Sequence, residues 1–584
     1  TATGSSIDEI DDTTAANVST SGVLDLTAGT TIGATAATGE LDTSIGTLRV
    51  SAGGTVDILE ATGIILGDGT GDVTSSAGAI TIETTAGTIT TGNTVTTTGS
   101  GGGITLGSGG SNAITIGHTL TTDGSGAIDI NSGAAFTLSD GITLSSTSGT
   151  IDIDTTSTND LTVNGDITTG AGAVTLTGTQ LITMDTGSLV QSDGAVLLVG
   201  TGTVTIDAVT STANTVGISS SGGSIVEADS SNLVTGTTVT LDADTTGADS
   251  VGTLANAINT TATTLEASSG TGGVFVDETD GLVIGGTGVQ TTGASGDIVI
   301  TTVGDLTLDE DVTAAGTGSV TLTLNTAGAT LATSALADDI ASTSGAITIT
   351  ADVLTLSTGT IASSGALVLQ PLTTTRPMVI GAAGAASDMA LDDTELDLLT
   401  DGFSGITIGR SDSTGGLTST TADFLDPLTL RSGAATLNGL TTSQDNAGIT
   451  VTSSAGTAVT VGADLTAHGS GAIDINSGGA FTLSDGITLS STSGVITIDT
   501  TGANALAVNG TVQTGTAGTI TLTGTNAITM DTDSLVQSGT GNIILASAAG
   551  GVVVDVITST SGDVTITATG SSIDEIDDTT AANV

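Results

Sequence analysis

Short strand-like triplets recur along this chain at a nearly constant interval. One series begins at Ile128, Ile151, Val174 and Val196, with steps of 23, 23 and 22 residues, and each triplet has an aliphatic residue at both ends. Gly, Asn, Asp and Ser separate the triplets, which is typical of short strands joined by turns. A strand that returns at this interval predicts a coil in which each turn lies on the one before.

Further triplets within each interval, such as Phe136–Leu138 and Ile142–Leu144, give three short strands per turn. Parallel crossovers favour a right-handed hand. We therefore predict an all-β, right-handed parallel β-helix, or β-solenoid, with about 23 residues per turn. Because side chains alternate along a strand, the aliphatic ends of each triplet should point inward and the central residue outward.

Two duplications organise the chain. Residues Thr1–Val18 return unchanged as Thr567–Val584, and Gly124–Gly149 returns almost unchanged as Gly469–Gly494. The first identity predicts one 566-residue period (567 − 1) of a tandem array, followed by the start of the next copy. We expect the following parts: turns with an irregular loop at the start (1–117), regular turns (118–213), a solenoid with modified turns (214–370), an irregular insertion with a short helix (371–440), a second copy of the regular turns (441–566) and the start of the next repeat (567–584).

The modified turns are predicted from a weaker internal similarity between the start of the chain and residues 222–284. The aligned residues are Ile7 with Ile225, Glu9 with Glu227 and Asp11 with Asp229. The insertion holds all three Pro residues and three of the four Arg residues. Within it, LDDTELDLLTDG predicts a short helix with Asp392 and Asp393 at its start and Gly402 just past its end.

The charge of the chain limits its partners. It has 61 Asp and Glu residues against four Arg and no Lys, and its formal net charge is −57. Such a surface repels nucleic acid and anionic membranes but attracts divalent cations. No apolar stretch reaches the roughly 18 residues of a membrane span. We expect self-association and divalent cations as partners, with no nucleic acid and no membrane span.

Calcium is the one cofactor that the sequence suggests, because carboxylates in turns supply the oxygen ligands that it prefers. The best candidate site is the loop that recurs with the long period, but the sequence favours the other interpretation, in which these residues are solvated loop acids. The candidate ligands are Asp8, Glu9, Asp11 and Asp12, and a further acidic group is Asp277, Glu278 and Asp280.

The arginines of the insertion allow two interpretations. Arg376, Arg410 and Arg431 could dock against an acidic loop of a neighbouring chain. Alternatively, they pair locally with Asp392, Asp393, Asp423 or Asp426.

Catalysis has little support in the sequence, and we expect no enzyme. The two histidines, His118 and His468, are not at equivalent positions of the duplication, because 118 + 345 is Ala463. Neither lies in a motif with partners at fixed spacing. A polysaccharide lyase or hydrolase generally needs a basic residue or a paired acid in a groove, and no Lys or Arg occurs between Arg49 and Arg376.

The stretches LVLQPLTTTRPMVIG, ELDLLTDGFSGITIGRSDSTGG and FLDPLTLRSG, together with turns such as GAIDINSG and ITLSSTSG, resemble the giant bacterial surface proteins of the filamentous-haemagglutinin type. The resemblance implies a secreted, β-helical, extracellular protein of the cell surface. We expect a structural repeat segment of a fibre, sheath or surface coat that self-associates end to end and laterally. The alternatives are an adhesin stalk and, more remotely, an enzyme acting on polysaccharide.

Overall fold

The computed structural model describes residues 1–8, 15–33, 39–334 and 338–576, and the chain divides into two units, residues 1–297 and 298–584. Each unit is a parallel β-solenoid with about 23 residues and three short strands per turn, as the sequence predicted. One turn of the first unit comprises β12 (Ile128–Ser132), β13 (Phe136–Leu138) and β14 (Thr143–Ser146). Ile128 of β12 lies opposite Ile151 of β15 (Ile151–Thr155) in a parallel ladder.

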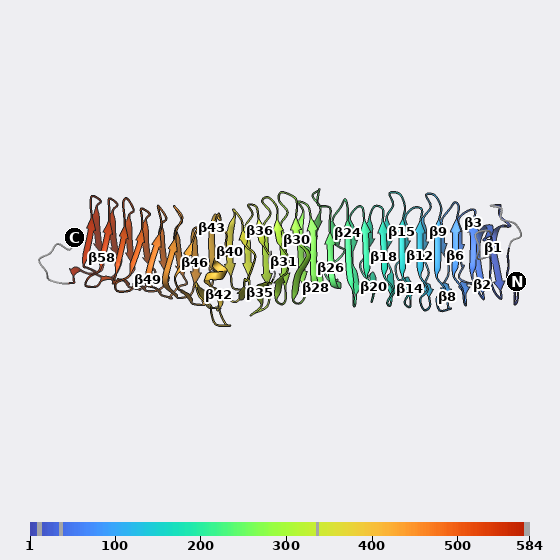
Figure 1. Ribbon diagram of the computed structural model, residues 1–584, viewed down its shortest axis with the longest axis horizontal. Helices are drawn as coiled ribbons and strands as arrows, with labels where there is room; N and C mark the ends of the chain where they lie inside the picture. Colours follow the sequence, from blue (N-terminus) through green and yellow to red (C-terminus); the bar gives the residue numbers. More distant parts are fainter. Residues whose placement is uncertain (9–14, 34–38, 335–337, 577–584) are drawn as a thin grey trace. The chain divides into compact units, whose positions relative to one another are not determined.

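The same face continues through β6 (Ile80–Thr84), β9 (Ile104–Ser108) and β18 (Val174–Gly178), which Figure 1 shows side by side with β12 and β15. In the second unit β50 (Ile473–Ser477), β53 (Ile496–Thr500) and β56 (Ile520–Gly524) stack in an equivalent register. The duplicated sequences therefore form equivalent turns, because matching aliphatic residues stack on one another.

The core is a column of aliphatic side chains. Ile128 and Ile130 are fully buried, while Asp129 between them faces outward. Burying each such aliphatic side chain contributes about 1.5–3 kcal/mol before chain entropy is counted. Buried hydroxyls at strand ends bond to the turns, as where Ser146 Oγ donates to the carbonyl of Gly126 and accepts from the N–H of Gly149, both at 2.8 Å. The turns are thereby tied to the coil without disulfides.

At one corner of the coil, several successive turns leave room only for glycine. A Cβ at Gly149 would lie 2.1 Å from the carbonyl oxygen of Gly126, and one at Gly172 would lie 2.0 Å from that of Gly149. The second unit repeats the column, since a Cβ at Gly494 would lie 2.0 Å from the Gly471 oxygen. Backbones of successive turns therefore approach more closely here than any side chain allows.

The first unit contains modified turns in which a long strand replaces two short ones, and β2 (Leu41–Ala52) and β28 (Ile258–Ser269) are examples. β2 pairs with β3 (Val56–Glu60), β4 (Ile64–Leu66) and β5 (Val73–Ser75). β28 pairs in the same way with β29 (Gly273–Glu278) and β30 (Leu282–Thr291).

The coil also continues through residues 371–440. β40 (Ala366–Gln370) pairs with β43 (Gly405–Gly409), which pairs with β46 (Leu428–Ser432). The residues between β40 and β43 form β41 (Met378–Ile380), β42 (Met389–Leu391) and the helix α1 (Asp393–Leu396). Asp392 caps this helix, as predicted, and forms a capping box with Glu395. The helix ends at Leu396, with Asp397 as its C-cap, so the expectation that it would extend to just before Gly402 was wrong.

Candidate functional site

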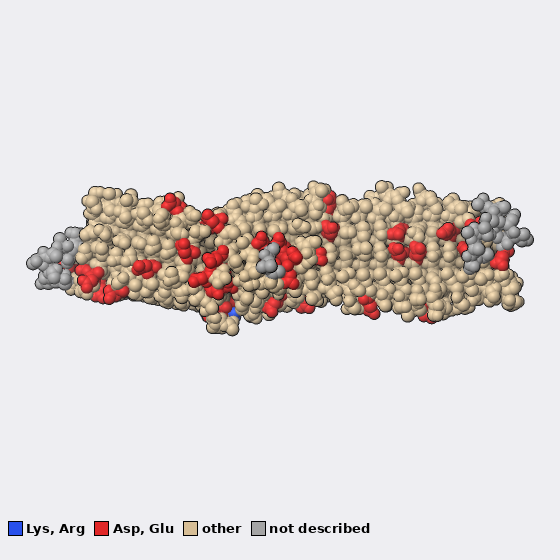
Figure 2. Space-filling view, in the orientation of Figure 1, with Lys and Arg blue, Asp and Glu red and all other residues tan. Residues whose placement is uncertain are grey.

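The proposed calcium loop is described only in part. Asp8 is exposed and accepts a hydrogen bond from the hydroxyl of Ser6, while Glu9, Asp11 and Asp12 lie outside the described residues. Within the described ranges, no group of three or more His, Asp or Glu side chains is arranged to hold a metal ion. On the face shown in Figure 2, acidic side chains form separate groups with uncharged stretches between them.

Three glutamates of the first unit bind backbone at the modified turns, and they differ from the solvated acids that the sequence favoured. Glu60 is fully buried at the end of β3. Its carboxylate accepts from the hydroxyl of Thr43 at 2.7 Å and from the N–H of Ile45 at 3.0 Å. It also accepts from the N–H of Thr62 at 2.9 Å. Glu60 thus satisfies donors that the long strand β2 leaves without a ladder partner.

Glu278 repeats this arrangement at the end of β29. Its Oε2 accepts from the hydroxyl of Thr260 at 2.7 Å and from the N–H of Ala262 at 3.1 Å. Burial raises the pKa of Glu278 to about 7, and the neighbouring Asp280 carboxyl adds to the shift. The acidic group around Glu278 is therefore in part a structural element of the turn.

Glu227 is the third buried carboxylate of this kind. It accepts from the backbone N–H of Asn259 at 2.6 Å and from the Asn259 side-chain amide at 2.9 Å. Burial raises its pKa to about 7, while the bonds from Asn259 oppose the rise. The sequence signal for two of these glutamates is the similar distance along the chain from Thr43 to Glu60 and from Thr260 to Glu278. The regular alternation of the strands gave no reason to single out this spacing.

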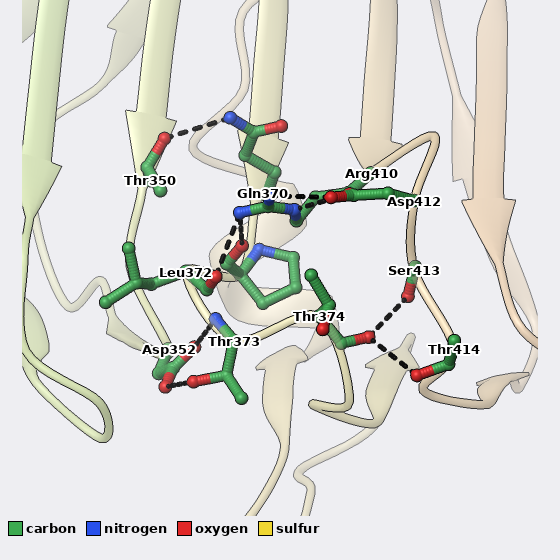
Figure 3. Close-up of polar contacts among 11 residues, drawn as sticks. Thr350, Asp352, Gln370, Leu372, Thr373, Thr374, Arg410, Asp412, Ser413 and Thr414 are labelled. Atoms are coloured by element: carbon green, nitrogen blue, oxygen red, sulfur yellow. Dashed lines mark hydrogen bonds and ion pairs between the residues drawn. The ribbon is translucent and has the colours of Figure 1, made fainter.

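Arg410 is the centre of a polar cluster in the second unit (Figure 3). Its Nε and Nη2 donate to the two carboxylate oxygens of Asp412 at 2.8 and 3.0 Å. Its Nη1 donates to the carbonyls of Pro371 and Leu372 at 3.3 and 2.9 Å. Arg410 therefore joins the end of β43 to the segment that leaves β40.

Asp352 lies at the other edge of this cluster and is almost fully buried. It accepts from the N–H groups of Thr373 at 2.8 Å and Gly328 at 2.9 Å, and from the Thr373 hydroxyl. Burial opposes ionisation, but these hydrogen bonds and the charge of Arg376 together lower the pKa of Asp352. The carboxylate thus holds the start of the 371–376 loop.

The local partners expected for the arginines were wrong. Asp392 caps α1, and Asp426 accepts from the N–H of Phe403 at 3.0 Å. Arg376 Nη2 donates to the carbonyls of Ala386 and Asp388 at 3.1 and 3.4 Å. Arg431 is exposed and shows no ion pair within the described part of the chain. The three guanidinium groups therefore differ in their contacts.

Two aspartates at the centres of strand triplets stack on each other, and both point outward as the alternation rule predicted. Asp129 and Asp152 are partners in the parallel ladder and face outward. Desolvation, followed by the charges of Asp154 and Asp129, raises the pKa of Asp152. His118 Nδ1 lies 3.1 Å from the carbonyl oxygen of Thr91, and His468 Nδ1 lies 3.0 Å from Asp445 Oδ1. Each histidine therefore has a simple structural contact.

These features define a β-solenoid protein with internal repeats. Comparison with protein-family models, curated proteins and solved structures finds no match to this chain. No helix in the described part of the chain is long and apolar enough to cross a membrane.

Proposed function

We propose that this chain is a structural repeat segment of a secreted β-solenoid that forms an extracellular fibre, sheath or surface coat. Successive copies of the period join through the duplicated 18-residue segment, which serves as one turn shared by two copies. The observation that carries the proposal is that the two copies of this segment bond through different backbone groups.

The first copy bonds to the turn that follows it. Ala2 pairs with Ala28 and Ile7 pairs with Ile32, both in parallel. The N–H of Ile7 donates to the carbonyl of Thr31 at 2.9 Å, and the carbonyl of Ile7 accepts from the N–H of Gly33 at 2.8 Å. This copy therefore uses both backbone groups of its isoleucine.

The second copy bonds to the turn that precedes it. Ile573, the equivalent of Ile7, pairs with Val552, and Ala568, the equivalent of Ala2, pairs with Ser547. The bonds run from the N–H of Val552 to the carbonyl of Ser572 at 3.0 Å and from the N–H of Ile576 to the carbonyl of Val554 at 3.1 Å.

The two sets of bonds are compatible in a single turn. The bonds to the following turn use the N–H and the carbonyl of Ile7. The bonds to the preceding turn use the carbonyl of Ser572 and the N–H of Ile576, which correspond in sequence to Ser6 and Ile10. A shared segment can thus hold a turn on each side, which is how a solenoid extends without a free edge. The side chain of Ile573 is 50% exposed at the last described turn, and a following copy would bury it.

The composition supports an exposed, durable location. A charge of −57 keeps adjacent coils soluble, and the absence of Cys leaves ladder bonds and packing as the source of stability. No Lys or Arg occurs between Arg49 and Arg376, so that part of the chain contains no tryptic site. These features are consistent with an extracellular material that is exposed to proteases.

A chain in which residues 1–566 precede the full 584-residue sequence tests the junction. Backbone amide exchange is followed by mass spectrometry in the internal copy of the shared segment and in the terminal copy of the single-period chain. We expect the internal copy to exchange more slowly because it has a turn on both sides. Equal exchange in the two copies would contradict a shared turn.

A matched variant sharpens this test. Ile573→Pro removes an N–H that the terminal segment does not use but that the internal segment would donate to the next turn. The variant should therefore accelerate exchange at the junction of the two-period chain and leave the single-period chain nearly unchanged. Electron microscopy of the two-period chain, with and without a calcium chelator, then tests fibre formation and its dependence on cations.

A further inference from the structure

A shallow groove of about 440 Å³ lies along one face of the second unit. It crosses four parallel strands, and its floor includes outward-facing hydroxyl and carboxamide side chains. The strands are β49 (Val459–Ala467), β52 (Thr488–Ser491), β55 (Thr511–Thr514) and β58 (Leu535–Ser538), and Thr560, which follows β61 (Val556–Ser559), also lines the groove.

The polar side chains of the groove form one column in register. Thr466 lies opposite Ser490, Ser490 opposite Gln513, and Gln513 opposite Gln537. The residues that alternate with them, such as Val512 and Val536, are fully buried, so the column has a rigid base. Successive groups therefore repeat at about the 4.8 Å strand spacing.

The two carboxamides of this column are available for a ligand. Thr466 and Ser490 bond to each other through their hydroxyls at 3.3 Å. No hydrogen bond to the side chain of Gln513 or Gln537 occurs within the described part of the chain, although the two residues are neighbours in the ladder. Each carboxamide offers two N–H donors and one acceptor oxygen.

The chemistry of the groove selects an uncharged ligand. None of its lining residues is charged, although the whole chain carries −57. Such a surface matches a molecule that presents donors and acceptors together without charge, as the hydroxyls of a sugar do. A longer chain of sugars could bond to several turns at once, because the groove runs from turn to turn.

We propose that this groove binds a neutral glycan, with Gln513 and Gln537 as its principal hydrogen-bonding residues. The proposal goes beyond the structural role and does not rest on it. The duplicated face of the first unit provides an internal comparison, because Thr168 stands where the second unit has Gln513, and only Gln191 remains as a carboxamide.

Affinity electrophoresis of the full chain tests the proposal, with gels that contain a β-glucan, an α-glucan, a xylan or a galactomannan. At least one of these neutral polysaccharides should retard the chain, and alginate, which is anionic, should not. The double variant Gln513→Thr/Gln537→Thr should weaken retardation at least about tenfold, because two pairs of hydrogen-bonding groups are lost. Gln191→Thr in the first unit is the matched control and should leave retardation unchanged.

Circular dichroism and amide exchange of β55 and β58 establish that the double variant retains its turns. The proposal fails if none of the four neutral polysaccharides retards the chain, or if the folded double variant is retarded as strongly as the parent. Sedimentation of the same proteins identifies the other possible occupant. If the double variant changes only self-association, the groove is a contact between copies of this chain and the glycan proposal is wrong.

Discussion

Glu60 and Glu278 are structurally equivalent, since each carboxylate accepts one hydrogen bond from a threonine hydroxyl and one from the N–H two residues further along the same long strand. A strand that spans two faces of the coil loses part of its ladder, and the buried carboxylate replaces the missing acceptors. These glutamates are therefore acids that stabilise the turns from within the buried interior.

Replacing Glu60 with alanine should destabilise the first unit by about 3 kcal/mol, because the N–H of Ile45 and the hydroxyl of Thr43 would be left buried without an acceptor. Urea unfolding, followed by amide exchange of β2, measures the change. Glu83→Ala on the adjacent strand β6 is the control, since Glu83 is exposed there. Equal losses for the two variants would show that the bonds of Glu60 are unimportant.

The raised pKa of Glu278 predicts a dependence of stability on pH. In the folded state its pKa is about 7, against an ordinary value of 4.5. The folded state therefore binds the proton more tightly, so this contribution to stability is complete below about pH 4.5 and is lost as the pH rises through about 7. Thermal unfolding between pH 4.5 and 8 should show the first unit becoming less stable over this window.

The same experiment on Glu278→Gln separates this group from the other carboxyls. A glutamine does not titrate, so the decline should become shallower, although Glu227 contributes a similar one because its pKa is also about 7. An unchanged pH profile in the Glu278→Gln variant would contradict the assignment.

Arg410→Gln should loosen the loop that begins at Pro371. The guanidinium holds two carbonyls of this loop and both oxygens of Asp412, and a neutral amide cannot make all four bonds. We expect faster amide exchange in residues 371–376 and a loss of about 1–3 kcal/mol in the second unit. Arg431→Gln is the matched control and should have an effect within about 0.5 kcal/mol, because Arg431 is exposed.

Gly494→Ala should destabilise the second unit by about 2 kcal/mol or more, because its methyl group would lie 2.0 Å from the carbonyl oxygen of Gly471. Gly405→Ala is the comparison, since a Cβ there has 3.6 Å to the nearest oxygen. Denaturant unfolding of the two variants should separate them clearly. Similar stability would mean that the corner can widen to admit a methyl group.

The regular turns were predictable because one rule, alternation of side chains along short strands, acts at every turn. Ile128 and Ile151 stack because their spacing equals one turn, and the capping of α1 by Asp392 follows from local chemistry alone. The candidate sites were less predictable. In the sequence, Glu60 is indistinguishable from a loop acid, because its role depends on β2 spanning two faces of the coil. Arg410 binds Asp412, which was not among the four acids that the sequence suggested.

The sequence by itself determined the period of the coil, the inward residues and the duplication, because each depends on spacing along one chain. Only the tertiary structure decided which carboxylates are buried, which partners the arginines bind and that Gln513 and Gln537 are ladder neighbours. Those outcomes depend on which groups of adjacent turns face one another and on how much water reaches them. Both are set by the register between turns that are about 23 residues apart.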